Sequence, residues 1–120
     1  MKEEVKRWIN KAEDDLRKAV DNFKIKNYDL TSFLCQQAVE KALKAILIEK
    51  TGKFPKIHDL IKLGKLINID EVLLKECEIL NPVYIKTRYP DINNEKYTAK
   101  ESKKDIEIAK KVLEWIKKNI

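Results

Sequence analysis

The sequence has few of the residues that interrupt helices or build metal and disulfide sites. Its 120 residues include two glycines, three prolines, two cysteines and one histidine. Scarce glycine and proline leave long uninterrupted segments, which favour helices, and no segment alternates apolar and polar residues long enough to predict a strand. One histidine and two distant cysteines cannot supply the four ligands of a structural zinc site or a disulfide framework. We therefore expect a helical protein with no metal site and no resident cofactor.

Long apolar runs and signature loops are missing as well. The longest apolar runs, such as residues 45–48, are only a few residues long, whereas a membrane span needs ~20. The charged start, Met1 to Glu4, predicts no signal peptide, so we expect a cytoplasmic protein with Cys35 and Cys77 as free thiols. There is no phosphate-binding Gly-x-x-x-x-Gly-Lys loop and no Gly-x-Ser-x-Gly elbow. These absences exclude the corresponding enzyme classes and association through a membrane span.

What the chain has in quantity is charge and apolar residues. Lysine and arginine total 26 against 20 acidic residues, a net charge of +6, and 43% of the residues are hydrophobic. That composition predicts one folded domain over residues 1–120. Two interpretations of the charge stay open: a solvated lysine-rich surface, or a surface that attracts phosphates.

Apolar residues at three- and four-residue steps predict an all-α, up-down bundle of about five helices. Three are long, over residues 2–25, 30–50 and 98–120, and two are short, starting near residue 59 and spanning about 70–80. Residues 86–97 show no periodicity and are predicted to form a loop.

Local signals mark where these helices begin and end. Asp29 is a plausible N-cap for the second helix, and Asp59 for the third. Gly52 is placed to stop the second helix. Thr98 with Glu101 forms a capping-box pattern before the last helix. In the fourth helix, Val72 is expected to face inward together with Leu73, Cys77 and Leu80.

The first candidate site is the segment Gln36 to Ala45 (QQAVEKALKA). Helical spacing places four polar side chains of this segment on one face, beside small alanines: Gln37, Glu40, Lys41 and Lys44. One interpretation is a surface i,i+4 pair between Glu40 and Lys44, and the other is a polar strip that lines a groove.

The second candidate is Ile57-His58-Asp59-Leu60, which holds the sole histidine. His58 either bonds nearby backbone in a structural turn, or acts as a proton donor or phosphate contact, because histidine titrates near neutral pH.

The third candidate is the segment from Tyr84 to Asp91 (YIKTRYPD). Arg88 beside Tyr89 is a plausible anion or base contact, since a guanidinium grips phosphate bidentately and a ring can stack. Alternatively, Arg88 pairs with a carboxylate such as Glu40 or Asp14 and ties this segment to a helix.

In this order, the segments resemble the HEPN domain, a nucleotide-binding domain of higher eukaryotes and prokaryotes. The resemblance covers nearly the whole chain and rests on four segments: WINKAEDDL (8–16), FLCQQAVEKALKA (33–45), His58-Asp59-Leu60 and Thr87-Arg88-Tyr89-Pro90-Asp91. It implies a small helical bundle that forms a homodimer, often paired with a minimal nucleotidyltransferase in a toxin–antitoxin-like system.

Other family members are metal-independent ribonucleases, in which a histidine follows an arginine by a few residues. Here Asn93, Asn94 and Glu95 stand where that histidine would be, and no histidine follows Arg88. Because asparagine cannot shuttle a proton as histidine does, the sequence departs from the ribonuclease pattern, and whether the protein is an enzyme stays open.

These observations give a leading hypothesis and two alternatives. The leading one is a protein that binds a nucleotide such as ATP, or a nucleotidyltransferase partner, through a polar cleft. Its lining would be Gln37, Glu40, Lys41, Lys44, His58, Arg88 and Tyr89. The first alternative is a ribonuclease toxin acting on RNA, with Arg88 on the scissile phosphate and His58 as general acid or base. The second is a module for self-association.

Overall fold

The computed structural model describes residues 1–88 and 97–120. Within them the chain forms six helices: α1 (Glu3–Lys24), α2 (Tyr28–Thr51), α3 (Leu60–Leu66), α4 (Glu71–Leu80), α5 (Val83–Arg88) and α6 (Ala99–Asn119). The predicted all-α bundle is confirmed, with α1, α2 and α6 as its long helices.

Helix α5 was not predicted, and its first-turn contacts explain how it arises. The prediction ended the fourth helix near residue 80 and placed a loop at 86–97. In the structure Pro82 begins a new turn, because its carbonyl accepts the amides of Ile85 at 3.1 Å and Lys86 at 3.0 Å. Proline is well suited to a helix start, where its missing N–H costs nothing.

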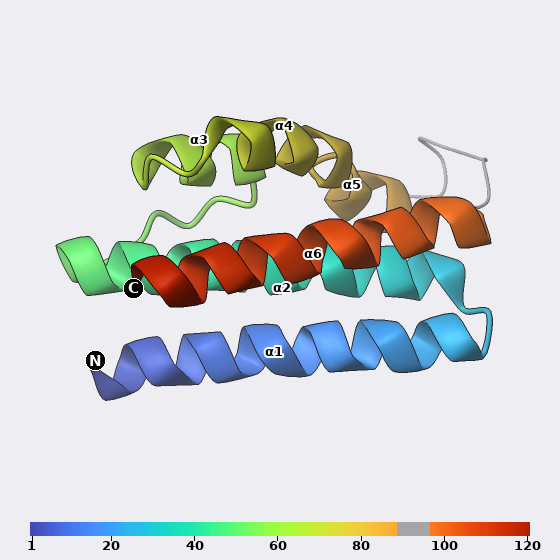
Figure 1. The fold of residues 1–120 in the computed structure, drawn as a ribbon, viewed down its shortest axis with the longest axis horizontal. Coiled ribbons are helices and arrows are strands. Elements are labelled where there is room, and N and C mark those ends of the chain that lie inside the picture. The colour runs from blue at the N-terminus through green and yellow to red at the C-terminus, as the bar shows by residue number, and fades with distance from the viewer. Residues whose placement is uncertain (89–96) are drawn as a thin grey trace.

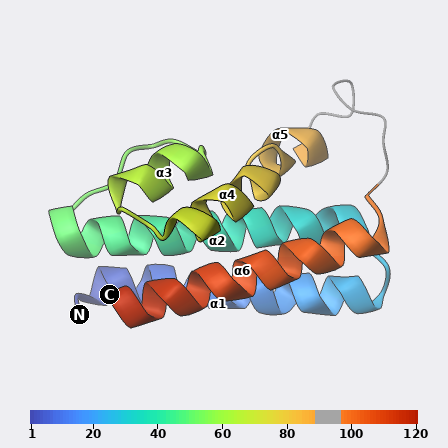
Figure 2. The same cartoon turned by 45° about the horizontal axis from the view of Figure 1, so that its top comes forward.

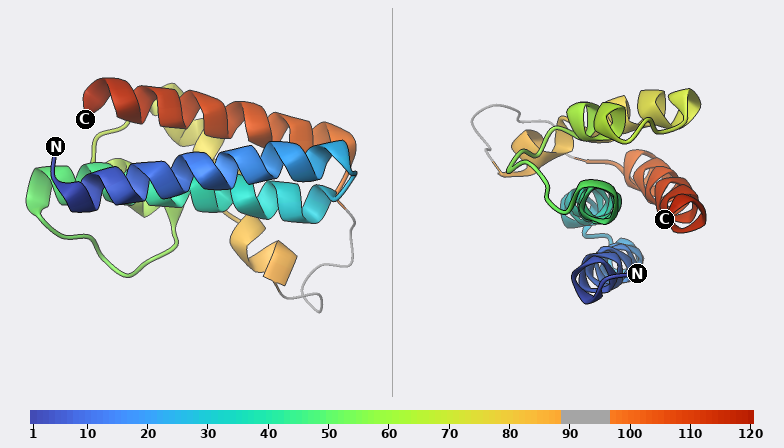
Figure 3. Two further views of the ribbon diagram at one scale, coloured as in Figure 1. Left: turned by 90° about the horizontal axis from the view of Figure 1, so that it is seen from below. Right: turned by 90° about the vertical axis from the view of Figure 1, so that its left-hand side faces the viewer.

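The long helices α1, α2 and α6 lie side by side, and α3, α4 and α5 pack on α2 and α6, on the side away from α1 (Figures 1 and 2). The end view shows α2 in the middle, with α1 below it, α6 beside it and the short helices above (Figure 3). This central position explains the composition of α2, because a helix that is covered on most sides has little surface left for water.

Accordingly, α2 buries polar side chains as well as apolar ones. Its apolar residues from Cys35 to Ile48 are mostly inaccessible, and five polar residues are buried with them: Thr31, Ser32, Gln36, Glu40 and Lys44. Buried polar groups need hydrogen-bond partners, so each of these five side chains requires a partner inside the protein.

Most helix boundaries follow the predicted signals. Gly52 ends α2 in the left-handed conformation with φ 82°, which glycine adopts without strain. Asp59 caps α3 by accepting the amides of Ile61 at 2.9 Å and Lys62 at 3.2 Å. Thr98 accepts the amide of Glu101 at 3.1 Å at the start of α6.

Two local predictions were wrong. Helix α2 begins at Tyr28, with Asn27 as its N-cap, so Asp29 lies in the first turn and its carboxylate accepts the neighbouring Leu30 amide at 2.8 Å. Val72 is 65% exposed, because the face of α4 that packs inward runs through Leu73, Cys77 and Leu80.

In the described ranges, none of the helices combines the length and the apolar character that crossing a membrane requires.

Candidate functional site

A buried carboxylate, that of Glu40, is the centre of the polar cluster on α2. Glu40 is 4% exposed. One oxygen, Oε2, accepts a hydrogen bond from Lys44 Nζ at 2.9 Å. The imidazole Nδ1 of His58 lies 3.0 Å from Oε1 and 3.1 Å from Oε2. The cluster therefore joins an acid, a base and a titratable ring across 18 residues of sequence.

Gln36 and Gln37 extend this cluster along α2. Gln36 Nε2 lies 3.4 Å from both Glu40 Oε1 and the carbonyl oxygen of His58, and its Oε1 accepts from Gln37 Nε2 at 2.7 Å. One glutamine thus bonds both the side chain that anchors His58 and the backbone that carries it. This fixes the loop before α3 against α2.

The charge of the buried Lys44 is balanced by partners inside the protein. Its side chain is 6% exposed and paired with Glu40, and its Nζ lies 5.2 Å from the centroid of the Phe54 ring. That ring meets Trp8 of α1 edge to face at 4.9 Å. An ammonium over an aromatic face gains electrostatic attraction, so the cation is satisfied without reaching solvent.

His58, in contrast, reaches solvent while its Nδ1 is anchored. Its side chain is 50% exposed, and its ring stacks on Tyr84 of α5, with centroids 4.3 Å apart and planes 14° from parallel. Because the Glu40 carboxylate only accepts hydrogen bonds, Nδ1 must donate. In the neutral ring the free lone pair is then on Nε2, the nitrogen that Glu40 does not hold.

A pocket of about 330 Å³ opens beside the stacked rings. Its lining combines polar groups with the apolar side chains of Ile61, Pro82 and Ile85. The rim is fixed by Asn81, which accepts the Leu60 amide at 2.8 Å and donates to Asp59 at 3.2 Å. A mainly apolar hollow with a few placed polar groups is the usual form of a small-molecule site.

Comparison with known proteins bears on the whole chain. Residues 5–120 match the profile of the HEPN domain. The chain belongs to the HEPN domain family.

Solved structures agree with that assignment. ST0689, described as an archaeal HEPN homologue, is 33% identical with a TM-score of 0.82 over 99% of this chain and 98% of its own. TT1696 from Thermus thermophilus is 26% identical with a TM-score of 0.89 over 97% and 98%. An HEPN domain protein from Thermotoga maritima, 22% identical over 93% and 95% at a TM-score of 0.74, shares the fold. The search of curated proteins gave no match.

The structure separates the predicted site residues into three groups. Glu40, Lys44 and His58 come together, and Gln37 joins them through Gln36. Lys41 turns to the α1 side, where its ammonium pairs with the buried carboxylate of Asp15.

Two predicted residues lie at the edge of what the structure describes. Arg88 is the last residue of α5, one helical turn after Tyr84, so the two positions share a face of this helix. Tyr89 lies outside the described residues. Homodimer formation and pairing with a nucleotidyltransferase stay predictions.

The interpretation of Glu40 and Lys44 as a surface pair was wrong, because both are buried. The sequence does carry a signal for this. Ser32, Gln36, Glu40 and Lys44 recur every fourth residue, beside the apolar row Cys35, Val39 and Leu43, in a helix whose middle is otherwise largely apolar. A polar row that borders an apolar row in such a helix indicates buried partners. Gln36 could have been found this way, whereas the stacking of Tyr84 depends on the unpredicted α5.

A second buried polar cluster joins α2 to α6. The hydroxyls of Ser32 and Ser102 lie 3.0 Å apart, and Ser102 donates to the Tyr28 carbonyl at 2.9 Å. Beside them Asp105 is 3% exposed, and burial raises the pKa of its carboxyl to about 6, although a hydrogen bond from Ser32 acts the other way. Burial also raises the pKa of the Cys35 thiol, so this cysteine is inert rather than nucleophilic.

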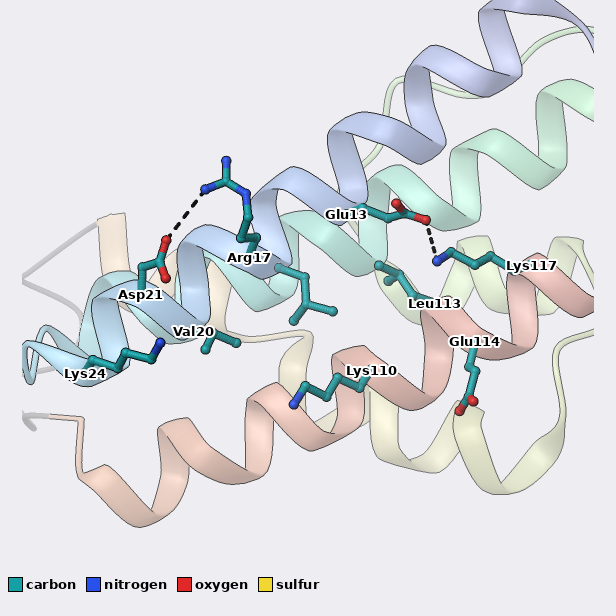
Figure 4. Close-up of a pocket in the computed structure, with 10 residues that line it drawn as sticks. Glu13, Arg17, Val20, Asp21, Lys24, Lys110, Leu113, Glu114 and Lys117 are labelled. Carbon is teal, nitrogen blue, oxygen red and sulfur yellow. Dashed lines mark ion pairs between the residues drawn. The ribbon is translucent and has the colours of Figure 1, made fainter.

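A larger groove of about 690 Å³ separates α1 from α6 (Figure 4). Leu16, Val20 and Leu113 line it between charged side chains. Four of the lining charges form ion pairs: Glu13 pairs with Lys117 across the groove, and Arg17 with Asp21 at 3.6 Å along α1. None of the predicted site residues that the structure describes lines this groove, so the Glu40 cluster remains the candidate site.

Proposed function

We propose that this HEPN protein binds a nucleotide at the surface formed by His58 and Tyr84, next to the end of α5. The observation that carries the proposal is an exposed imidazole that is stacked on a tyrosine and anchored by a buried carboxylate. The hydrogen bond to Glu40 and the stacking on Tyr84 fix the orientation of the ring. A histidine ring that binds a ligand in one orientation needs to be fixed in this way, whereas a surface histidine does not need it for stability.

The side chains at this surface suit the base and the phosphates of a nucleotide. The parallel rings of His58 and Tyr84 form a flat surface, and bases stack on such surfaces. Nε2 of His58 can meet a phosphate oxygen when the ring is protonated. Arg88, one turn beyond Tyr84, would supply a bidentate phosphate contact.

Lys41 and Lys44 have a different part in this proposal. Their ammonium groups are paired with Asp15 and Glu40, so neither contacts phosphate in this proposal: Lys44 supports Glu40, and Lys41 lies on the α1 side. The ligand then meets mainly His58, Tyr84 and Arg88.

Calorimetric titration with ATP and magnesium tests the proposal. We expect saturable binding by the wild type, and a loss of at least about tenfold in affinity, or ~1.4 kcal/mol, for His58→Ala and for Arg88→Ala. Lys24→Ala, an exposed position on α1, is the matched control and should bind like the wild type. Equal affinity in all four proteins, or no heat with the wild type, would contradict the proposal.

One geometric feature favours a second function, metal-independent cleavage of RNA. His58 bonds Glu40 as a general base bonds the carboxylate that orients it, with 3.0 Å between Nδ1 and Oε1. Such a pair can move a proton through Nε2. His58 would therefore take the role that the family's ribonucleases give to a histidine after the arginine.

An RNA cleavage assay in EDTA distinguishes this second function from binding alone. We expect cleavage that is lost in His58→Ala and reduced in Glu40→Gln, with a pH profile that changes in the Glu40 variant. Intact RNA after long incubation with the wild type would leave nucleotide binding as the function.

A further inference from the structure

A pocket of about 320 Å³ is lined by residues from the end of α4, from α5 and from the start of α6. Helix α5 and the first turns of α6 lie at the same end of the bundle (Figure 1). Pro82 borders both this pocket and the one beside His58, but the polar side chains that line the two are different. We call it the Asp105 pocket, after the buried carboxyl that lines it. Its volume is within the range of small-molecule sites.

The Asp105 pocket has an apolar part and a polar part. Ile79 of α4, together with Pro82 and Val83, supplies the apolar part, and Ile79 is 42% exposed. The polar part comes mainly from the start of α6, and Lys86 of α5 adds a further charge. A ligand that fills the pocket therefore needs one polar side and one apolar side. The polar lining residues at the start of α6 are Tyr97, Glu101, Lys104 and Asp105.

Asp105 differs from the other two buried carboxylates of the described residues because it has no ion pair. Asp15 and Glu40 each pair with a lysine. Asp105 is 3% exposed, and none of the ion pairs within residues 1–88 and 97–120 includes it. A buried charge without a partner is costly, and burial accordingly raises the pKa of this carboxyl to about 6. A ligand with an ammonium group would supply a partner.

The hydroxyl of Tyr97 is a second polar group at this pocket that lacks a partner. Its oxygen is buried and has no hydrogen bond within the part of the chain that the structure describes. Burial raises the pKa of this hydroxyl to about 12, and the negative charges of Asp105 and Glu101 add to the rise. The phenol therefore keeps its proton and can donate a hydrogen bond. Because buried polar groups are nearly always hydrogen-bonded, a ligand with an acceptor oxygen suits this position.

We infer that the Asp105 pocket binds an aliphatic α-amino acid. The ammonium group of the ligand donates to Asp105 and Glu101, and its carboxylate accepts from Tyr97 and Lys104. Its side chain packs on the apolar part of the pocket. Two lysines and two acidic residues line the pocket, so a zwitterion matches its charge better than a simple cation or anion. This site is separate from the proposed nucleotide site.

Calorimetric titration at pH 7 with leucine, isoleucine and valine tests the inference. We expect saturable binding of at least one of them by the wild type, and an affinity lower by at least about tenfold in Asp105→Asn and in Tyr97→Phe. Both substitutions nearly keep the shape of the side chain, so they remove a charge or a hydroxyl without opening a cavity. Glu107→Gln, at an exposed position of α6 outside the pocket, is the matched control and should bind like the wild type.

Two analogues of the bound amino acid show whether both of its charged groups are recognised. For leucine they are isoamylamine, which lacks the carboxylate, and isocaproate, which lacks the ammonium group. Each should bind at least about tenfold more weakly than the amino acid. The inference is overturned if the amine binds as tightly as the amino acid, if Asp105→Asn binds like the wild type, or if none of the three amino acids shows saturable binding.

The pH dependence of binding is a readout that a purely structural role of Asp105 would not change. Protonation removes the charge that holds the ammonium group, and the pKa of this carboxyl is about 6. The affinity of the wild type should therefore fall about tenfold from pH 7 to pH 5. Tyr97→Phe, which keeps the carboxyl, should show the same fall, and the binding that remains in Asp105→Asn should show none. An affinity of the wild type that is equal at the two pH values would overturn the inference. The other groups at this carboxyl or its pocket are the same in wild type and Asp105→Asn: Ser32 of α2, Lys86 of α5, Tyr97, and Glu101 and Lys104 of α6.

Discussion

At the scale of single residues, Glu40 is a buried carboxylate with two titratable partners. It is buried among apolar neighbours, bonds an equally buried lysine and holds an exposed histidine. Taking a carboxylate and an ammonium from water is costly, and their attraction offsets that cost only while both are present. The pair is therefore poor evidence for stability and better evidence for positioning of His58.

Replacing Glu40 by alanine should lower the free energy of unfolding by about 3–5 kcal/mol, because Lys44 is left as an unpaired buried charge. Urea denaturation measures this. The double variant Glu40→Leu/Lys44→Met, which removes both charges together, should regain most of the loss while still freeing His58. A loss below about 1 kcal/mol in the single variant would show that the pair is not buried as described.

The buried carboxyl of Asp105 makes a prediction about pH. Its pKa of about 6 in the folded protein lies above the ordinary 3.8, so folding favours the protonated form. The cost of ionisation is absent below pH ~4, grows as the pH rises, and is complete above pH ~6 at about 3 kcal/mol. Asp105→Asn should therefore be more stable than the wild type at pH 8 by up to that amount, and the difference should vanish toward pH 4.

Thermal or urea denaturation across this pH range measures how the stability difference changes with pH. Asp14 serves as a control because its pKa is shifted in the opposite direction. Arg17 and Lys18 lower the pKa of the exposed Asp14 carboxyl to about 2, so any stability it adds is present at neutral pH and lost as the pH falls through its pKa. A stability difference between Asp105→Asn and the wild type that grows toward acid pH would contradict the account.

At the scale of elements, two aspartates cap neighbouring short helices in the same way. Asp59 accepts the Ile61 and Lys62 amides at the start of α3, and Asp70 accepts those of Val72 at 3.1 Å and Leu73 at 3.2 Å at the start of α4. Only the first cap is next to His58. The two caps therefore allow stability and binding to be separated.

Asp59→Ala and Asp70→Ala should each cost about 1 kcal/mol of stability, the usual value of an N-cap. Asp59→Ala should also weaken ATP binding, because it releases Asn81 and the loop that presents His58. Asp70→Ala should leave ATP affinity unchanged. Denaturation and calorimetry on the same samples give both quantities, and equal binding losses in the two variants would argue against a site at the start of α3.

The comparison of sequence and structure differs between elements. Helices α1, α2, α3, α4 and α6 were predictable from their apolar periodicity, and side-chain caps mark the starts of α3 and α6 through Asp59 and Thr98. Helix α5 was not, because six residues after a proline are too few to show a period. The same holds for the site. The polar row through Glu40 and Lys44 can be recognised in the sequence, whereas the stacking of His58 on Tyr84 depends on how α5 packs.

At the scale of the whole molecule, the central position of α2 connects the site to the core. The helix that carries Glu40 is covered by α1, α6 and the short helices (Figure 3), so the anchor of His58 belongs to the most enclosed element. The half-exposed ring of His58 lies outside that core. The molecule thus combines a buried support with an accessible imidazole.

The central claim is that a nucleotide meets His58, and the chain offers a direct probe because His58 is its sole histidine. The measurement is NMR of the imidazole ring, recorded while ATP is added to the wild-type protein. We predict one set of ring signals that moves with ATP and saturates, with Nδ1 remaining the nitrogen bonded to Glu40. Ring signals that stay fixed while ATP binds elsewhere, or while no binding occurs, would contradict the account.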